Sequence, residues 1–358
     1  MSIFSETIGG ISELDLANVE PGHGRSHSPV TALAQIPLID VSQEGPVGLV
    51  SAQPARCAEL VAAGSECYGG PFVRLADPLS RGWLTRSQNP YLGEIDAVAE
   101  VVARRGVYLL NLSYEWSCTS AVAADLELGG NRLQRTLDWP LHGLGRNLVV
   151  ARQQGTQGIY YNITWPGFVG VVSAMAPGRF AIALNQAPMR RFGLPIPLDW
   201  FINRLLLWCT DSIPPLHLLR QVFDECRNYS EAMERLRDTP ICLPALITLS
   251  GIEPDEGCVI ERSETRAAVF PAPQCAANHW LSPGIPGTDR GIDSRERGAL
   301  MKQLYRTPEF EWLVPPILND CTRVAIVANA KRGLLMVQGW EVGGPATTVF
   351  ELNEASST

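Results

Sequence analysis

Cys118 is the residue whose type and setting point most directly to chemistry. It lies in the segment YEWSCTSAVA, where an apolar run gives way to a strand-like pattern, and the hydroxyls of Ser117, Thr119 and Ser120 surround it. A cysteine that only fills a core does not need such polar neighbours, and most of the other eight cysteines do lie in apolar runs. Cys118 is therefore the candidate nucleophile.

Two charged residues follow Cys118 at a spacing that a hairpin would bring back to it. The segment TSAVAADLE alternates like a strand, LGGN is typical of a turn, and QRTLDWP carries Arg135 and Asp138 on the returning strand. A guanidinium close to the sulfur would lower the pKa of the thiol from about 8.5 and favour the thiolate. An Arg–Asp pair of purely structural function fits the same pattern.

Four segments in order resemble one family, the cysteine N-terminal-nucleophile (Ntn) hydrolases of the acid ceramidase and N-acylethanolamine acid amidase kind. These are NLSYEWSCTSAVA with QRTLDWP, then GFVGVVSAMAPGRFAIALNQ, DEGCVIERSE and CAANHW, together covering roughly residues 90–300. Choloylglycine hydrolases and isopenicillin N acyltransferases are related to this family. The resemblance implies an amide hydrolase with a thiol nucleophile.

The resemblance also implies a role for each matching residue. Cys118 is the nucleophile, Arg135 and Asp138 form its supporting pair, and Asn278 donates to the oxyanion. A second group completes the expected site: Asn185 near the oxyanion, Arg295 of DSRERG as a polar clamp with Arg297 as the alternative match, and Tyr114, Glu115, Trp139 and Trp165 as substrate contacts. Thr136 and Gln186 depart from the family's usual Asn and acidic residue.

Self-cleavage between Ser117 and Cys118 is the chemistry that this resemblance implies. It frees the α-amino group of Cys118, which can serve as general base toward its own thiol, so that neither a histidine, a metal nor a cofactor is required. The expected substrate is an N-acyl amine with an apolar acyl chain, because aromatic residues flank the matching segments. The cleaved N-terminal segment is expected to remain bound.

Apolar periodicity predicts an α+β fold. Helical spacing occurs at 55–64 and 91–106, with Gly64 and Gly106 as expected stops, and again at 198–209, 214–226, 230–238 and 294–306. Strand-like runs fill most of 119–186, 245–272 and 323–352. The resemblance specifies a four-layer αββα sandwich of two antiparallel sheets. The expected boundaries are a mobile lead-in (1–35), a helical segment (36–117), the catalytic domain (118–352) and a tail (353–358).

Composition excludes several classes of function. The net charge of −8 and the absence of a basic, aromatic-rich patch argue against a nucleic-acid partner. No run of 18 apolar residues predicts a transmembrane segment, and the N-terminus does not resemble a secretory signal, so a cytoplasmic location is expected. Nine cysteines without CxxC spacing fit neither the common zinc patterns nor a disulfide framework.

Three alternatives remain open on the sequence alone. His279 beside Asn278 permits a papain-like Cys/His/Asn site, although the local signature of that class is absent. Acyl transfer to an amine would use the same nucleophile, and a binding protein could retain the fold without catalysis. His23 and His27 have no third metal ligand nearby and are expected to belong to the solvated N-terminal region.

Overall fold

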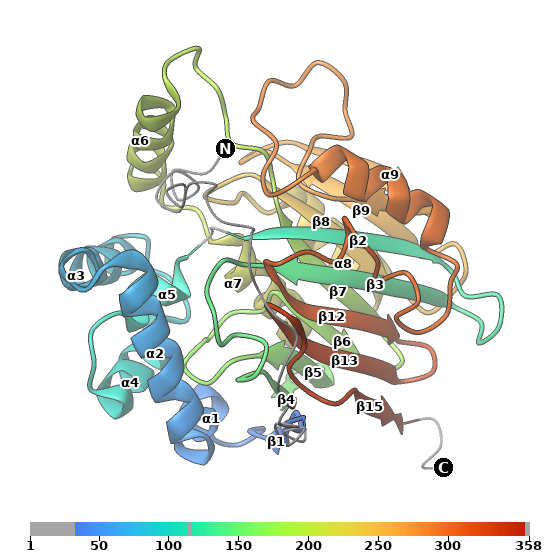
Figure 1. The fold of residues 1–358 in the computed structure, drawn as a ribbon, viewed down its shortest axis with the longest axis horizontal. Coiled ribbons are helices and arrows are strands. Elements are labelled where there is room, and N and C mark those ends of the chain that lie inside the picture. Colours follow the sequence, from blue (N-terminus) through green and yellow to red (C-terminus); the bar gives the residue numbers. More distant parts are fainter. Residues whose placement is uncertain (1–32, 114–115, 355–358) are drawn as a thin grey trace, which may run out of the picture.

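Two β-sheets packed face to face form the centre of the protein (Figure 1). The computed structural model describes residues 33–113 and 116–354. One sheet has the order β1 (Leu38–Asp40), β4 (Val149–Gly155), β5 (Gly158–Thr164), β6 (Ser173–Ala176), β7 (Phe180–Gln186), β8 (Ala245–Ser250), β9 (Gly257–Arg262), β10 (Ala267–Pro271). The other has the order β11 (Gln274–Ala276), β2 (Ser117–Ala124), β3 (Asn131–Asp138), β12 (Thr322–Asn329), β13 (Leu334–Glu341), β14 (Gly344–Pro345), with β15 (Phe350–Asn353) also on β13.

Helices cover the outer face of each sheet. Helices α7 (Pro215–Glu225) and α8 (Tyr229–Asp238) pack on the first sheet, and α9 (Ser294–Leu304) packs on β2 and β11 of the second. The predicted α+β class and four-layer helix–sheet–sheet–helix order are therefore confirmed. The sheets are antiparallel except where β1 joins β4 in parallel.

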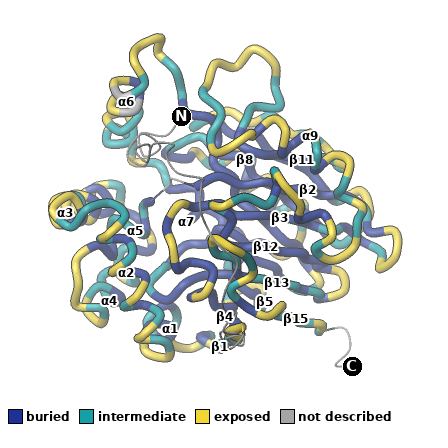
Figure 2. The backbone as a smooth tube through the Cα atoms, in the orientation of Figure 1, coloured by how far each residue is buried: buried dark blue, intermediate teal, exposed yellow. Residues whose placement is uncertain are grey.

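Strand β2 illustrates why the central strands are buried on both sides (Figure 2). Its sequence, SCTSAVAA, consists of small residues, and seven of the eight are buried. One side faces the opposing sheet, and the other faces α9, so the usual alternation of buried and exposed residues is lost. Small side chains allow both layers to approach this strand closely.

The N-terminal part of the chain forms a helical layer at one end of the sandwich (Figure 1). It contains α1 (Gly45–Ala52), α2 (Pro54–Tyr68), α3 (Gly70–Arg86), α4 (Leu92–Val102) and α5 (Val107–Asn111). The expected stop at Gly64 is wrong, because the helix continues to Tyr68. A Cβ atom at Gly64 would lie 3.0 Å from the Leu110 side chain, so this glycine serves close packing of α2 on α5. The other expected stop, Gly106, is also wrong, because α4 ends at Val102; Gly106 instead precedes α5 with φ of 114°, in the left-handed region that favours glycine.

Strand β1 connects this helical layer to the sandwich. Leu38–Asp40 pairs with Val150–Arg152 of β4, and Ala34 forms a parallel bridge with Thr347. The segment expected to be helical (36–117) therefore also contributes an edge strand. At the other end of the chain, β15 runs to Asn353, one residue into the expected tail. Most of the expected lead-in lies outside the described residues.

Helix α6 (Ile196–Trp208) follows β7 in the chain. Its predicted helical character is confirmed. No described helix has the length and apolar character needed to cross a membrane.

Candidate active site

The hairpin of β2 and β3 positions the candidate nucleophile. Ser117 pairs with Asp138, Cys118 with Leu137, and Ser120 with Arg135. The GG turn therefore returns the second strand to the point where the first begins, as the sequence predicts. Cys118 is the second residue of β2, and its side chain is fully buried.

Arg135 and Asp138 lie on opposite faces of β3, which corrects their prediction as one pair. Residues three apart along a strand point to opposite sides, because side chains alternate with a period of two. Arg135 shares the inner face with Cys118 and contacts the opposing sheet. Asp138 shares the outer face with Thr119, toward α9. The two side chains reach the nucleophile from different sides.

The inner face brings Arg135 to the sulfur. Arg135 Nη2 lies 3.1 Å from Cys118 Sγ and donates to the Leu184 carbonyl oxygen at 3.0 Å. Burial raises the pKa of the Cys118 thiol to about 11, although the Arg135 charge opposes this shift. The expected lowering of the thiol pKa is therefore not found in this structure, in which the Cys118 side chain is fully enclosed.

Arg135 is itself an unusual buried cation. Desolvation lowers the pKa of this guanidinium, and the nearby sulfur of Cys118 opposes the shift. Among the described residues, no carboxylate lies within ion-pair distance of it. A buried cation without an anionic partner stabilises any negative charge that develops on the adjacent sulfur.

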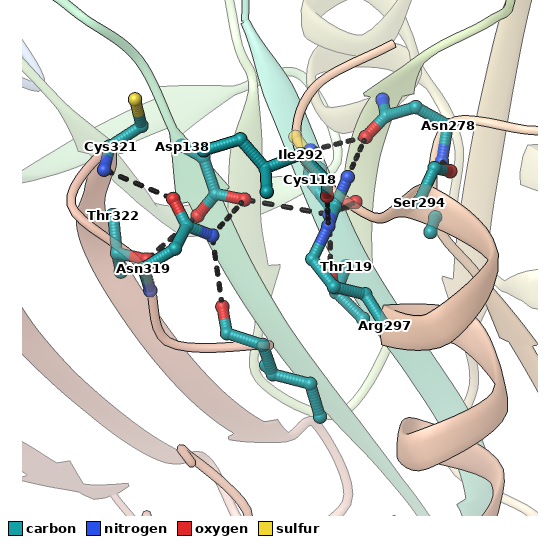
Figure 3. A network of polar contacts seen from close by, with 12 residues as sticks. Cys118, Thr119, Asp138, Asn278, Ile292, Ser294, Arg297, Asn319, Cys321 and Thr322 are labelled. Carbon is teal, nitrogen blue, oxygen red and sulfur yellow. Dashed lines mark hydrogen bonds and ion pairs between the residues drawn. The ribbon is translucent and has the colours of Figure 1, made fainter. Parts of the chain in front are cut away.

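Asn278 holds the backbone nitrogen of the nucleophile. It follows β11, and its Oδ1 accepts a hydrogen bond from the Cys118 N–H at 2.7 Å. Its Nδ2 donates to the Gln186 carbonyl oxygen at 2.8 Å, and its own N–H donates to Ser294 Oγ at 2.8 Å. The nitrogen that cleavage would convert into an amine is therefore already oriented by a side-chain amide (Figure 3).

Arg297, rather than Arg295, is the arginine at the site. Arg297 is fully buried, and its Nη1 donates to the Cys118 carbonyl oxygen at 2.6 Å and to Thr119 Oγ1 at 2.7 Å. Its Nη2 donates to Asn278 Oδ1 at 3.1 Å (Figure 3). Arg295 is 73% exposed and pairs with Asp289 at 2.8 Å. The two residues are separated by about 200° around helix α9, so they face opposite sides of it.

Asp138 anchors the outer face through contacts that local sequence does not reveal. Its carboxylate accepts from Thr322 Oγ1 at 3.0 Å, from Asn319 Nδ2 at 3.3 Å and from Arg297 at 3.5 Å (Figure 3). Burial raises the pKa of Asp138, and the Arg297 charge opposes that shift. Thr322 and Asn319 come from the start of β12 and the preceding loop. Sequence reasoning missed both because only the pairing of β12 with β3 brings them here.

Asn185 supports the site without contacting the sulfur. Its Nδ2 donates to Ser120 Oγ at 2.8 Å and to the Ala276 carbonyl oxygen at 3.2 Å. Ser120 Oγ in turn lies 2.8 Å from Thr248 Oγ1 of the opposing sheet. Asn185 thus links β7, β2 and β11 just ahead of Asn278, consistent with its expected location but in a positioning role.

The two predicted tryptophans line an apolar cavity of about 60 Å³. Trp139 immediately follows Asp138, and its ring lies 5.1 Å from that of Trp116, two residues before Cys118. Trp165 lines the same cavity and donates to the Leu144 carbonyl oxygen at 2.8 Å. Tyr114 and Glu115 lie outside the described residues. The opposite wall comes from the N-terminal helical layer, including Cys57, Leu60, Val61, Val107 and Leu110.

His279 contacts Ser294 rather than Cys118. Its Nδ1 lies 3.0 Å from Ser294 Oγ. Cys118 Sγ has Arg135 and a backbone carbonyl as its polar neighbours, so the structure lacks the Cys–His contact that a papain-like site requires.

Known proteins with similar sequences are amide hydrolases of the kind that the motifs resemble. Acid ceramidase of Bos taurus is 26% identical over 219 residues, which cover 55% of this chain and 53% of the relative. The N-acylethanolamine-hydrolyzing acid amidase of Oryctolagus cuniculus is 31% identical over 159 residues, covering 43% and 42%. The similarity is to Ntn amide hydrolases. The predicted family resemblance is thereby confirmed, and the chain spans about half the length of the curated relatives it matches.

Solved structures with related architecture include the Caenorhabditis elegans N-acylethanolamine-hydrolyzing acid amidase ortholog, with 23% identity, a TM-score of 0.46 and coverage of 60% of this chain and 93% of that chain. Penicillin V acylase from Agrobacterium tumefaciens has 13% identity, a TM-score of 0.39 and coverage of 66% and 86%. No family model matches the chain.

Proposed function

We propose that this protein is a cysteine Ntn amide hydrolase that cleaves its own chain between Ser117 and Cys118 and then hydrolyses an N-acyl amine. The observation that carries the proposal is the setting of Cys118 at the start of β2, with Arg135 at its sulfur and Asn278 at its nitrogen. The similarity to acid ceramidase and N-acylethanolamine-hydrolyzing acid amidase supports the same chemistry.

Cleavage would supply the general base for the Cys118 thiol, a role that no histidine fills among the described contacts of its sulfur. Sγ attacks the Ser117 carbonyl carbon, the thiol proton passes to the Cys118 nitrogen, and the C–N bond to Cys118 breaks. Water then hydrolyses the resulting thioester to a Ser117 carboxylate and frees the Cys118 thiol and amine. An α-amine has an ordinary pKa of about 7.7–8.0, so it can accept the thiol proton near neutral pH. Asn278 Oδ1 would keep this amine beside the sulfur.

Substrate turnover would use the same groups. The amine takes the thiol proton, Sγ attacks the amide carbonyl carbon, and the leaving nitrogen departs with that proton. Asn278 Nδ2 has two hydrogens, of which Gln186 accepts one, leaving the other for the oxyanion. Water then hydrolyses the thioester and releases the carboxylic acid. Arg135 stabilises the thiolate throughout.

The cleaved N-terminal segment would remain part of the enzyme. Strand β1 pairs with β4, and Asn111 Nδ2 donates to the Gly167 carbonyl oxygen at 2.9 Å. Trp83 Nε1 also donates to the Leu207 carbonyl oxygen at 3.1 Å. Separation would expose these polar groups together with the apolar face of the helical layer, which strongly disfavours dissociation.

The apolar cavity beside Trp139 supports an acyl chain as the group held by the enzyme. Each buried methylene contributes about 0.8 kcal/mol, so kcat/KM should rise about fourfold per methylene until the cavity is full. A series from acetyl to palmitoyl amides measures this directly. A flat or falling profile would instead favour a compact amide substrate.

Intact mass and N-terminal sequencing of the active protein test the proposal as a whole. We expect a new N-terminus at Cys118 and two fragments that copurify under native conditions. Hydrolytic activity from a wholly uncut chain would refute the mechanism. Product analysis with a competing amine distinguishes hydrolysis, which releases the acid, from acyl transfer, which yields a new amide.

A further inference from the structure

Ser294 connects the backbone of Asn278 to the imidazole of His279. Ser294 is the first residue of α9 and is 4% exposed. Its Oγ accepts the Asn278 N–H at 2.8 Å and lies 3.0 Å from His279 Nδ1. Among the contacts of residues 33–113 and 116–354, this imidazole nitrogen is the acceptor within reach of the hydroxyl hydrogen. With Ser294 as the donor to Nδ1, the neutral ring carries its proton on Nε2, and this is the tautomer assigned here.

Helix α9 is shaped to admit this ring. A Cβ atom at Gly298 would lie 2.8 Å from His279 Cε1, so only glycine leaves space for the imidazole against the helix. The same helix carries Arg297, which donates to Asn278 Oδ1. Asn278 is thus held at its backbone through Ser294 and at its side chain through Arg297, both from α9.

We infer that His279, acting through Ser294, is a positioning residue for Asn278, and that protonation of His279 weakens this hold. The inference rests on the proposed function, because it assigns Asn278 to the reacting groups. A protonated imidazole has a hydrogen on Nδ1 and cannot accept from Ser294. The hydroxyl hydrogen would then rotate away, and Ser294 Oγ would accept from both the imidazolium and the Asn278 N–H, so the hydrogen bond to Asn278 would share its acceptor with a charged donor.

Charged groups around His279 determine where this switch operates. Asp289 in the loop before α9, and Arg295, Arg297 and Lys302 on the helix, all act on this imidazole electrostatically. Burial lowers the pKa of His279; Asp289 opposes the shift, and the three cations reinforce it. The ring is therefore neutral at pH 7 and gains its proton below its ordinary range, so the hold on Asn278 weakens as the pH falls.

Three variants test the positioning role. His279→Phe removes the acceptor and should lower kcat about tenfold with KM unchanged, the size expected for loss of one hydrogen bond. His279→Asn supplies an acceptor without a titratable group, so it should recover most of that loss and remove the His279 step from the acid side of the kcat profile, while the inflection of the Cys118 α-amine remains. His142→Asn, at an exposed position, is the control and should keep the wild-type profile.

A measurement independent of catalysis accompanies the kinetics. In the Cys118→Ala protein, the NMR amide signal of Asn278 should shift with pH at the same midpoint as the His279 imidazole, and Ser294→Ala should abolish this coupling. The inference would be overturned if the Asn278 amide shift did not change over the pH range in which His279 titrates. A pH profile of His279→Asn identical to that of the wild-type protein would also overturn it. Should the wild-type protein hydrolyse no N-acyl amide, the proposed function fails, while the amide titration still decides the positioning inference.

Discussion

Two polar clusters in this protein are each built around buried arginine but have opposite electrostatic character. The nucleophile cluster consists of Cys118, Arg135, Asp138, Asn278 and Arg297. It holds two guanidiniums and one carboxylate, so with a neutral thiol it carries an excess positive charge. Desolvation lowers the pKa of Arg135, the cation nearest to the sulfur.

The interface cluster joins the N-terminal helical layer to the sandwich and consists of Tyr91, Glu94, Tyr160, Arg220 and Asp224. Arg220 pairs with Glu94 at 2.8 Å, lies 3.8 Å from Asp224 and stacks 4.3 Å from the centre of the Tyr91 ring. Tyr160 donates to Asp224 at 2.9 Å. Burial lowers the pKa of Arg220, but neighbouring acidic groups outweigh burial and hold this pKa above its ordinary value.

The two clusters differ in whether the charge of their buried arginine is neutralised by anionic partners. In the interface cluster, the cation has anionic partners, so no further charge is needed. In the nucleophile cluster, a cation faces a thiol that can become an anion, and the site gains its full stabilisation only when that anion forms. Buried charge alone therefore does not identify an active site; an incompletely neutralised charge beside a nucleophile does.

Cys118→Ala should have the largest effect on function. Loss of the sulfur removes the nucleophile, so both self-cleavage and turnover should be abolished, while the small change in side-chain volume leaves the fold intact. Intact mass, an amidase assay and circular dichroism measure the three properties. Unfolding of this variant would show that Cys118 is structural, and both clusters would then serve the stability of the fold.

Asp138→Asn should come next. It keeps the shape of the side chain but removes the only negative charge paired with Arg297 in the nucleophile cluster, so the clamp on Thr119 and Asn278 weakens. We expect kcat to fall at least about a hundredfold, the size of losing one positioned catalytic group. Near-normal turnover would show that Asp138 belongs to the architecture of the outer face.

The sequence predicted the β2–β3 hairpin correctly, but not which face of β3 each of its charged residues occupies. Turn residues and apolar alternation located β2, β3 and β7 to within three residues, because those signals are local. The assignment of Arg135 and Asp138 to one pair failed because the strand period places residues three apart on opposite sides. The same period was available from the sequence and could have given the correct arrangement.

The remaining contacts depend on long-range packing. Thr322 and Asn319 reach Asp138 only through the pairing of β12 with β3, for which no local pattern exists. The choice of Arg297 over Arg295 depends on how α9 is rotated against β2. Helices α1 and α3 were missed because their sequences are rich in Gly and Pro, which weaken helical signals, while packing determines the outcome.

Arg220→Met should affect stability rather than chemistry. Methionine retains much of the apolar volume but leaves Glu94 and Asp224 without their cation, and Glu94 is partly solvated. We expect the free energy of unfolding to fall by about 2 kcal/mol, below the usual cost of breaking a fully buried pair. Urea denaturation measures this value. Turnover per folded molecule should be unchanged, and a selective loss of kcat would place the interface cluster among the catalytic groups.

Arg295→Ala should have the smallest effect, although this residue lies two positions from Arg297. Its side chain is 73% exposed, and its ion pair with Asp289 is at the surface, where such pairs contribute little. We expect kcat to change less than about twofold at pH 7, as for most surface substitutions. Its one electrostatic consequence concerns His279: Arg295 is one of the cations that lower the pKa of this imidazole, so its removal should raise that pKa and move the acid limb of the kcat profile slightly toward higher pH. Arg297→Ala is the matched comparison on the same helix and should lose self-cleavage, because the contacts to Cys118, Thr119 and Asn278 disappear together. Equal effects of the two substitutions would mean that rotation of α9, and with it the assignment of the site arginine, is wrong.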